Sequence, residues 1–215
     1  YKQIALSLPL LLWSQLSLAD WSNDSAQNVE AHTIKLRQHI HQHPERGNME
    51  FKTSKLVQKE LKSYGIEVKT GFAKTGVIGI LKGALPGPVM ALRADMDALP
   101  VQEKTGLSFA SKEKALYQGK QEPVMHACGH DSHAATILGA ALLLKEHEKE
   151  LKGKVRVIFQ PAEEAPGGAG TVIKAGGLDG VKAIFGIHSS SLFDVGTLGI
   201  SAGPNHAAVE KFKII

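Results

Sequence analysis

The sequence has few of the residues that mark several classes of protein. Cysteine occurs once, at Cys128, so no internal disulfide can form and a disulfide-rich miniprotein is excluded. Aromatic residues make up 6% of the chain and are not interleaved with basic runs, which argues against nucleic acid as a partner. With 43% hydrophobic and 21% charged residues over 215 positions, the composition is that of a globular protein of one domain, or one domain with part of another.

Long apolar runs are also scarce, and the clearest one lies near the N-terminus. Lys2 precedes the run 4–13 (IALSLPLLLW), which is shorter than the about 20 apolar residues that a membrane-spanning helix needs. Ser17 and Ala19 then provide the small residues that a signal peptidase reads. We therefore expect residues 1–19 to be a secretory signal peptide, the protein to be exported (periplasmic or secreted), and no stable membrane span.

The rest of the chain alternates between helical and strand-like patterns. Apolar residues at helical spacing predict helices that end before Pro44, cover 52–64 and follow Asp131, with a short helix at 169–175. Apolar runs predict strands at 66–69, 77–81, 89–92, 155–159, 183–187 and 197–201. A turn is expected at 83–88, and 101–124 is expected to be irregular. Unbroken apolar strands that alternate with helices predict an α/β fold with a mostly parallel sheet.

Side chains that bind metals or move protons gather where the predicted strands end. They lie in four segments: 93–100 (RADMDALP), 126–131 (HACGHD), 160–164 (QPAEE) and the single residue His188. Ligands of α/β sheets bind beyond the carboxyl ends of the strands, so these segments could form one rim. The evidence for a functional site is that four segments converge on one edge of the sheet, because each motif taken alone is weak evidence.

Cys128 and His130 place a thiol and an imidazole two residues apart. In an extended segment both would face one point, and both are good ligands for zinc. Asp131 is expected to cap the N-terminus of the helix that follows. A lone cysteine is more often an apolar core residue, so this motif gains weight only from its neighbours.

Glu163 and Glu164 are adjacent carboxylates in a loop shaped by Pro161 and two glycines. In an extended chain they would point to opposite sides, which suits one for a metal and the other for a substrate water. Taken alone, such a pair is more often a solvated acidic turn.

The remaining histidines are weaker candidates for metal ligands. His188 alone is more often a structural residue than a ligand. His39 and His41 are expected to be surface or packing residues, because a spacing of two spreads side chains around a helix. His133 is expected to lie beside the site rather than in it. The sequence contains no nucleophile elbow, phosphate-binding loop or dinucleotide fingerprint.

Together, the segments LRQHIHQHPE, ALRADMDALPVQEKTGLSFAS, MHACGHDSHAA, IFQPAEE and FGIH, in this order, resemble the aminoacylase and carboxypeptidase-type metallohydrolases. More narrowly, they resemble the amidohydrolase branch that contains hippurate hydrolases, N-acyl-L-amino-acid amidohydrolases and plant auxin-conjugate hydrolases. The resemblance extends from about residue 32 to the end of the chain. The combination of RADMDALP, ACGHD and PAEE is highly specific.

This resemblance implies a zinc-peptidase-like catalytic domain with two divalent metal ions (Zn, Mn, Co or Ni) per subunit. The metal ligands that it implies are Cys128, His130, Glu164 and His188. It implies Glu163 as the general base and Asp97 as the residue that orients this base. Asp95 stands where relatives outside this branch carry a metal-binding histidine, so we do not count it as a ligand.

The implied reaction is hydrolysis of the amide bond of a small-molecule N-acyl amino acid. Glu163 would take a proton as water attacks the carbonyl and return it to the leaving amine. One alternative is a carboxypeptidase or dipeptidase that uses the same two-metal site. Others are an inactive, truncated remnant that only binds a metal or ligand, and a serine or thiol hydrolase that uses Cys128 with a nearby base and no metal.

The resemblance also implies a division into domains. Relatives are longer and insert a smaller α/β lid domain that serves dimerisation and substrate binding. We expect residues 20–205 to be the N-terminal part of the catalytic domain and 206–215 to be the first lid strand. The lid histidine and the last metal-binding histidine are not among the 215 residues, so we expect a fragment or truncated product with weakened metal binding. For the full-length form the resemblance implies a homodimer.

Overall fold

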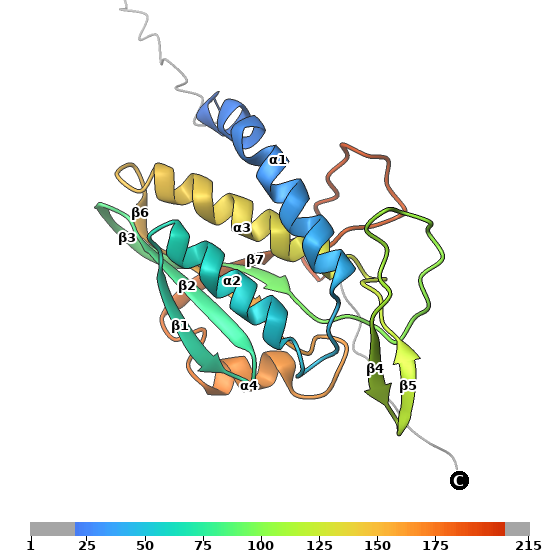
Figure 1. Cartoon of the computed structure of the whole chain (residues 1–215). Coiled ribbons are helices and arrows are strands. Elements are labelled where there is room, and N and C mark those ends of the chain that lie inside the picture. The colour runs from blue at the N-terminus through green and yellow to red at the C-terminus, as the bar shows by residue number, and fades with distance from the viewer. Residues whose placement is uncertain (1–19, 205–215) are drawn as a thin grey trace, which may run out of the picture.

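The computed structural model describes residues 20–204, with side chains from Ser25 onward. The predicted signal peptide at 1–19 and the predicted lid strand at 206–215 lie outside the described residues. None of the helices in the described part combines the length and apolar character that crossing a membrane requires. Two helices are followed by five strands, and helices and strands alternate in the rest of the described chain. The helices lie against a central sheet (Figure 1).

The central sheet has five strands in the order β1-β2-β6-β3-β7. They are β1 (Glu67–Phe72), β2 (Gly76–Lys82), β3 (Leu85–Asp95), β6 (Lys152–Gln160) and β7 (Val181–Gly186). β3 pairs in parallel with both β6 and β7, whereas β2 pairs antiparallel with both β1 and β6. Within this sheet only β2 therefore runs against the other strands, which confirms the predicted α/β fold with a mostly parallel sheet.

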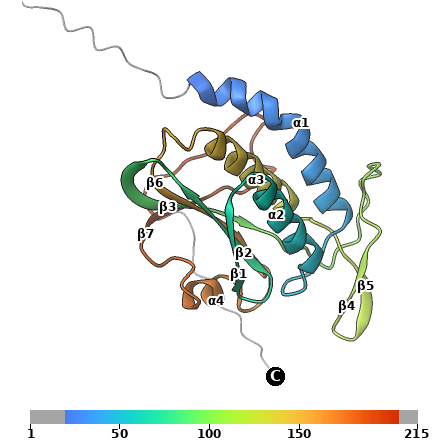
Figure 2. The same cartoon turned by 60° about the vertical axis from the view of Figure 1, so that its left-hand side comes forward.

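Both faces of the sheet are covered by helices (Figure 2). One face carries α1 (Asp20–Gln42), α2 (Phe51–Ser63) and α3 (His130–Glu146), and α4 (Gly168–Lys174) lies on the other. Val77 and Phe159, which are paired across β2 and β6, are buried in the cluster beneath α2 and α3. Their neighbours Ile78 and Ile158 are buried on the opposite face. Burial on both faces explains why these strands are unbroken apolar runs.

The structure differs from the sequence-based expectation in three segments. Residues 114–123 are not irregular but form a hairpin of β4 (Lys114–Tyr117) and β5 (Lys120–Pro123). Gln118 and Gly119 join them with φ values of 48° and 81°, and two such residues form the tight turn that hairpins favour. β3 begins at Leu85, so the expected turn at 83–88 is shorter. The expected strand at 197–201 does not form, and no described strand lies alongside to pair with it.

The carboxyl ends of three parallel strands meet at one edge of the sheet. Asp95, the last residue of β3, is in register with Gln160, the last residue of β6. Arg93 of β3 is in register with Gly186, the last residue of β7. The segments that follow these strands therefore emerge side by side.

Candidate metal centre

His130 begins α3 and faces the carboxyl ends of the strands. Its side chain is buried, and Nδ1 donates a hydrogen bond to the backbone carbonyl oxygen of Asp97 at 2.7 Å. Because Nδ1 carries the proton in this bond, a neutral His130 presents a lone pair at Nε2. This buried Nε2 has no hydrogen-bond partner in the described structure, which is the state of a nitrogen poised to bind a metal.

Gly129 sets the direction of the chain before His130. It adopts φ 83°, and a Cβ at this position would overlap the hydroxyl oxygen of Ser189. The segment from Cys128 to His130 is therefore a turn that leads into α3 and not the extended segment expected from the sequence. Gly129 is also the N-cap residue, so the expectation that Asp131 fills that position is wrong.

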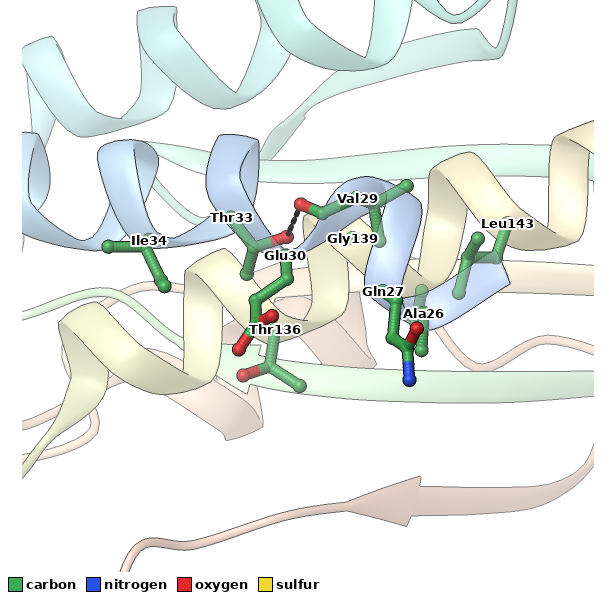
Figure 3. Close-up of a pocket in the computed structure, with 10 residues that line it drawn as sticks. Ala26, Gln27, Val29, Glu30, Thr33, Ile34, Thr136, Gly139 and Leu143 are labelled. Carbon is green, nitrogen blue, oxygen red and sulfur yellow. Dashed lines mark hydrogen bonds between the residues drawn. The ribbon is translucent and has the colours of Figure 1, made fainter. Parts of the chain in front are cut away.

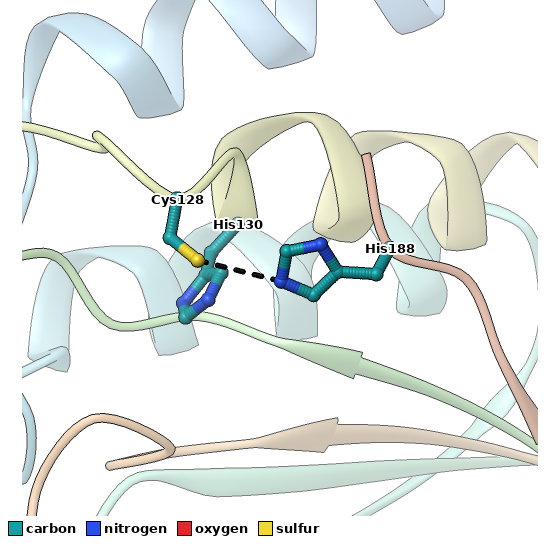
Figure 4. A group of neighbouring side chains, drawn as sticks. All are labelled: Cys128, His130 and His188. Carbon is teal, nitrogen blue, oxygen red and sulfur yellow. Dashed lines mark hydrogen bonds between the residues drawn. The ribbon is translucent and has the colours of Figure 1, made fainter. Parts of the chain in front are cut away.

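Three side chains converge here: Cys128 from the turn before α3, His130 from the first residue of α3 and His188 from the segment after β7 (Figure 4). Their ligand atoms all lie within 4.8 Å of one another. His188 donates from Nδ1 to the carbonyl oxygen of Ser189 at 2.7 Å, so its Nε2 is the unprotonated nitrogen. Cys128 Sγ lies 3.3 Å from this Nε2, and the thiol donates to it. One sulfur and two ring nitrogens thus point at a common centre.

Glu163 and Glu164 form a second group with the same His130. One oxygen of each carboxylate and a His130 nitrogen lie within 4.8 Å of one another. The two carboxylates therefore share one group and do not point to opposite sides, as an extended chain would require. The chain bends here because Ala162 has a φ of 51°, which ends the extended conformation of β6.

Asp97 lies beneath the glutamate loop with its side chain buried. Its Oδ1 accepts the backbone N–H of Glu163 and its Oδ2 that of Glu164, each at 2.9 Å. Burial acts to raise the pKa of Asp97, but the hydrogen bonds from His130 and from these two N–H groups outweigh it and lower the pKa below its usual value. Asp97 is thus a carboxylate that fixes the backbone of the loop.

Carboxylates surround the thiol of Cys128. Burial, together with the negative charges of Glu164, Glu163 and Asp95, raises its pKa to about 11. A thiol in this environment keeps its proton at neutral pH unless a cation compensates the negative charge. The side chains present, a thiol, imidazoles and carboxylates, suit a borderline divalent ion, and the partnerless Nε2 of His130 supports the same assignment.

Asp95 and His133 lie next to this centre and could form a third group with His130. His133 donates from Nδ1 to Asp95 Oδ1 at 2.7 Å and accepts the backbone N–H of Ser189 at its Nε2 at 2.8 Å. Arg93 donates to Asp95 Oδ2 at 2.7 Å. Burial acts to raise the pKa of Asp95, but these donors and the charge of His130 lower it to about 2. Because both nitrogens and both oxygens are already hydrogen-bonded, the pair supports the segment that carries His188.

A second buried network, which the sequence did not indicate, lies where α1 meets α3. His41 donates to Asp131 Oδ2 at 2.9 Å and to Glu103 Oε1 at 3.1 Å, and Arg37 donates to the same Asp131 oxygen at 2.8 Å. The hydrogen bond to Asp131 is the main cause that raises the pKa of His41, and Glu103 adds to it despite burial. His41 is therefore a buried packing residue, as expected, whereas His39 is exposed.

The described structure has two large hollows, of which one lies beside the candidate metal ligands. A cavity of about 900 Å³ is lined by Cys128, Gly129 and His188 and extends to Arg37 and Leu107. Another of about 740 Å³ lies between α1 and α3, where Glu30, Thr33 and Thr136 are its polar side chains along with Gln27 (Figure 3). Because it contains no histidine or cysteine, the second hollow is unrelated to the candidate metal ligands.

Comparisons with known proteins agree with this geometry. Residues 91–213 match the family described as Peptidase family M20/M25/M40. The chain is 48% identical over 200 residues to the N-acetyl-L-cysteine deacetylase of Bacillus subtilis (strain 168), covering 93% of this chain and 46% of that protein. It is 44% identical over 203 residues to thermostable carboxypeptidase 1 of Saccharolobus solfataricus, covering 93% and 50%.

A solved structure is similar in fold as well as in sequence. The crystal structure of the Bacillus subtilis YXEP protein, described as a dinuclear metal binding peptidase from the M20 family, superimposes with a TM-score of 0.76 at 47% identity. The match covers 83% of this chain and 48% of that one. The chain thus spans about half the length of the curated relatives and the solved structure that it matches.

Proposed function

Because the chain belongs to peptidase family M20/M25/M40, we propose that its protein is a metal-dependent hydrolase that cleaves the amide bond of N-acyl amino acids. One observation carries this proposal above the others. The Nε2 atom of His130 is buried without a hydrogen-bond partner, and the ring of His130 belongs to groups that also contain a thiol, a second imidazole and two carboxylates. The similarity to a deacetylase of an N-acyl amino acid supports the choice of substrate class.

The proposed metal ligands are Cys128, His130, Glu164 and His188, which would hold two divalent ions of Zn, Mn, Co or Ni. When bound, such ions lower the pKa of a water molecule and polarise the carbonyl group that is to be cleaved. In this chain Nδ1 of His130 donates a hydrogen bond to the backbone oxygen of Asp97. Nδ1 of His188 donates one to the backbone oxygen of Ser189. Both rings therefore keep their Nε2 atoms turned to the centre before any ligand arrives.

Glu163 is the proposed general base. Its carboxylate shares a group with His130 and Glu164 and is exposed to the solvent side of the loop, where a substrate could reach it. There it accepts a proton from the attacking water and returns it to the nitrogen of the leaving amino acid. Asp97 contributes by fixing the backbone nitrogens of Glu163 and Glu164, which sets the position of both carboxylates.

The proposal is tested by assaying the purified protein with N-acetyl- and N-benzoyl-amino acids in the presence of added Zn²⁺ or Mn²⁺. We expect turnover that a chelator removes. The Glu163→Gln variant should bind the metal nearly as well as the wild type and lose turnover, because an amide cannot accept the proton. A Glu163→Gln variant with an unchanged rate would show that another group is the base.

Two other hydrolases are consistent with the same atoms. The similarity to a carboxypeptidase favours peptides as substrates, and a panel of N-acyl amino acids, dipeptides and longer peptides separates the two. The contact of 3.3 Å between Cys128 and His188 is also the pair that a thiol hydrolase would use. Activity that survives a chelator would favour the thiol, whereas metal binding without turnover of any substrate would favour a non-catalytic remnant.

We also propose, from the sequence pattern alone, that residues 1–19 direct export and that the full-length form adds a lid domain, begun by 206–215, through which it dimerises. The N-terminal sequence of protein recovered from outside the cytoplasm tests the first. Sedimentation of the full-length protein tests the second.

A further inference from the structure

Glu50 is a buried carboxylate that belongs to none of the candidate metal groups among the described residues. Its side chain has 0% exposure. Oε1 accepts the backbone N–H of Ala162 at 2.8 Å and that of Asn48 at 3.0 Å, and Oε2 accepts the hydroxyl of Thr75 at 2.6 Å. Burial raises its pKa although these donors act in the opposite direction. A carboxylate that has been removed from water in this way needs all of these partners.

The place of Glu50 at the start of α2 does not explain these contacts. Glu50 is the N-cap residue of α2, but its side chain makes no capping hydrogen bond to that helix. The capping is done by Glu45, whose carboxylate accepts the backbone N–H of Lys52 and of Thr53. The side chain of Glu50 instead contacts Ala162, which lies 112 residues further along the chain.

Ala162 is the residue at which the chain turns from β6 towards the glutamates. Its φ of 51° is unfavourable for a residue with a Cβ, and such a conformation persists only when neighbouring contacts hold it. Glu50 holds its N–H, and Asp97 holds the next two, those of Glu163 and Glu164. Two buried carboxylates thus fix three successive backbone nitrogens.

The segment before Glu50 packs closely against the same loop. A Cβ added to Gly47 would lie 2.7 Å from Cβ of Ala165 and 3.3 Å from Oδ2 of Asp97. The segment 47–50 and the loop 162–165 are therefore in direct contact, and a movement of either displaces the other.

We propose that Glu50 is a positioning residue for the reaction: its carboxylate holds the backbone of Ala162 so that the carboxylates of Glu163 and Glu164 meet His130. This inference rests on the proposed function, in which Glu163 is the base and Glu164 a metal ligand. Glu50 itself lies under the loop and does not touch the substrate. Its loss should therefore reduce the rate of the chemical step through misplacement of the two glutamates.

Three variants of the complete protein test this inference. Glu50→Ala removes the acceptors for Ala162 and Thr75. Glu50→Gln keeps an amide oxygen for the two N–H groups, while its amide NH₂ donates to Thr75. Glu45→Ala is the matched control, since the Glu45 carboxylate also accepts two backbone N–H groups and a threonine hydroxyl, but all three belong to Lys52 and Thr53 and none to residues 162–164.

We expect Glu50→Ala to lower kcat by about 100-fold with a much smaller change in KM, as misplacement of catalytic groups by about 1 Å does. Glu50→Gln should restore most of the rate. Glu45→Ala should lower the unfolding midpoint while leaving kcat near that of the wild type. Rates are compared at saturating metal and well below the unfolding midpoint of each variant.

A second readout does not depend on turnover. The visible d–d absorption of bound Co²⁺ should change in Glu50→Ala, because Glu164 moves, and remain unchanged in Glu45→Ala. If Glu50→Ala does not fold, Thr75→Val takes its place, because it frees one oxygen of the Glu50 carboxylate and should lower kcat in the same direction by a smaller factor. In that case an unchanged kcat for Thr75→Val overturns the inference.

The outcomes separate this inference from the proposed function. If the wild type shows no chelator-sensitive hydrolysis, the proposed function is wrong, and the Co²⁺ spectra still decide whether Glu50 positions Glu164. If the wild type is active but Glu50→Ala matches Glu45→Ala in kcat and in its Co²⁺ spectrum, Glu50 only supports the fold and the inference is overturned.

Discussion

Replacing Asp97 by asparagine should destabilise the metal-free protein while leaving its shape nearly unchanged. The two oxygens of Asp97 each accept one backbone N–H, from Glu163 and from Glu164. Asparagine offers one oxygen and one NH₂, so one N–H loses its acceptor and faces a donor. A hydrogen bond to a charged group contributes about 1.5–3 kcal/mol, and a buried donor without a partner costs about 1–3 kcal/mol.

We therefore expect Asp97→Asn to lower the free energy of unfolding by about 3 kcal/mol, well within the about 5–15 kcal/mol that a domain possesses. The measurement is urea unfolding with a chelator present at pH 7. Asp179→Asn, at an exposed position, is the control and should change stability by less than about 0.5 kcal/mol. If both variants unfold alike, the loop is held by something other than Asp97.

The pH dependence of this difference has a definite sign. The pKa of Asp97 is lowered in the folded state, so its contribution is present above the unfolded pKa of about 3.9 and is lost as the pH falls through the folded value. The stability difference between the wild type and Asp97→Asn should therefore shrink as the pH falls below about 4. A difference that grows below about pH 4 would contradict this reasoning.

Three further changes have expected outcomes. The stabilisation that His41 provides, measured against His41→Gln, should be greatest below about pH 6.5 and decline as the pH rises through its raised pKa; a difference that is flat with pH would exclude a charged His41. The affinity of the wild type for Zn²⁺, measured by competition with a chelator, should rise with pH because the Cys128 thiol must lose its proton, and Cys128→Ser should bind more weakly and depend less on pH. Gly129→Ala should lower stability by at least about 1–2 kcal/mol in urea unfolding, because of its positive φ and the overlap with Ser189; an unchanged midpoint would mean that the turn adapts.

Sequence patterns predicted the parts of the fold that depend on burial. The run at 155–159 was identifiable as a strand because a parallel sheet that is covered on both faces needs unbroken apolar segments. The run at 183–187 was also identified as a strand, although Ile184 and Phe185 of β7 are exposed in the described structure. The hairpin at 114–123 was missed because its strands are short and polar, and because Gln118 is not among the residues (Asn, Asp, Gly) that usually precede glycine in such a turn.

The sequence predicted which residues form the candidate site but not how the backbone orients their side chains. The sequence identified Cys128 and His188 as neighbours of one centre, and the structure brings them together. It could not indicate that Ala162 adopts a positive φ, which turns both glutamates towards His130. The proposed role of Glu50 could not be predicted either, because the sequence does not distinguish a buried glutamate that binds a distant backbone N–H from an exposed glutamate.

The order of strands in the sheet has a consequence for how the chain is made. β3 lies between β6 and β7, yet a ribosome produces it before either of them. β1 and β2 can pair at once as neighbours in the chain, whereas Val89 of β3 must wait for Lys154 and then Val181. During synthesis at about 5–20 residues per second, this apolar strand stays without partners for several seconds. Nascent chains that stall before residue 152 should therefore leave β3 without either neighbouring strand, and slower translation of 96–151 should lengthen that period.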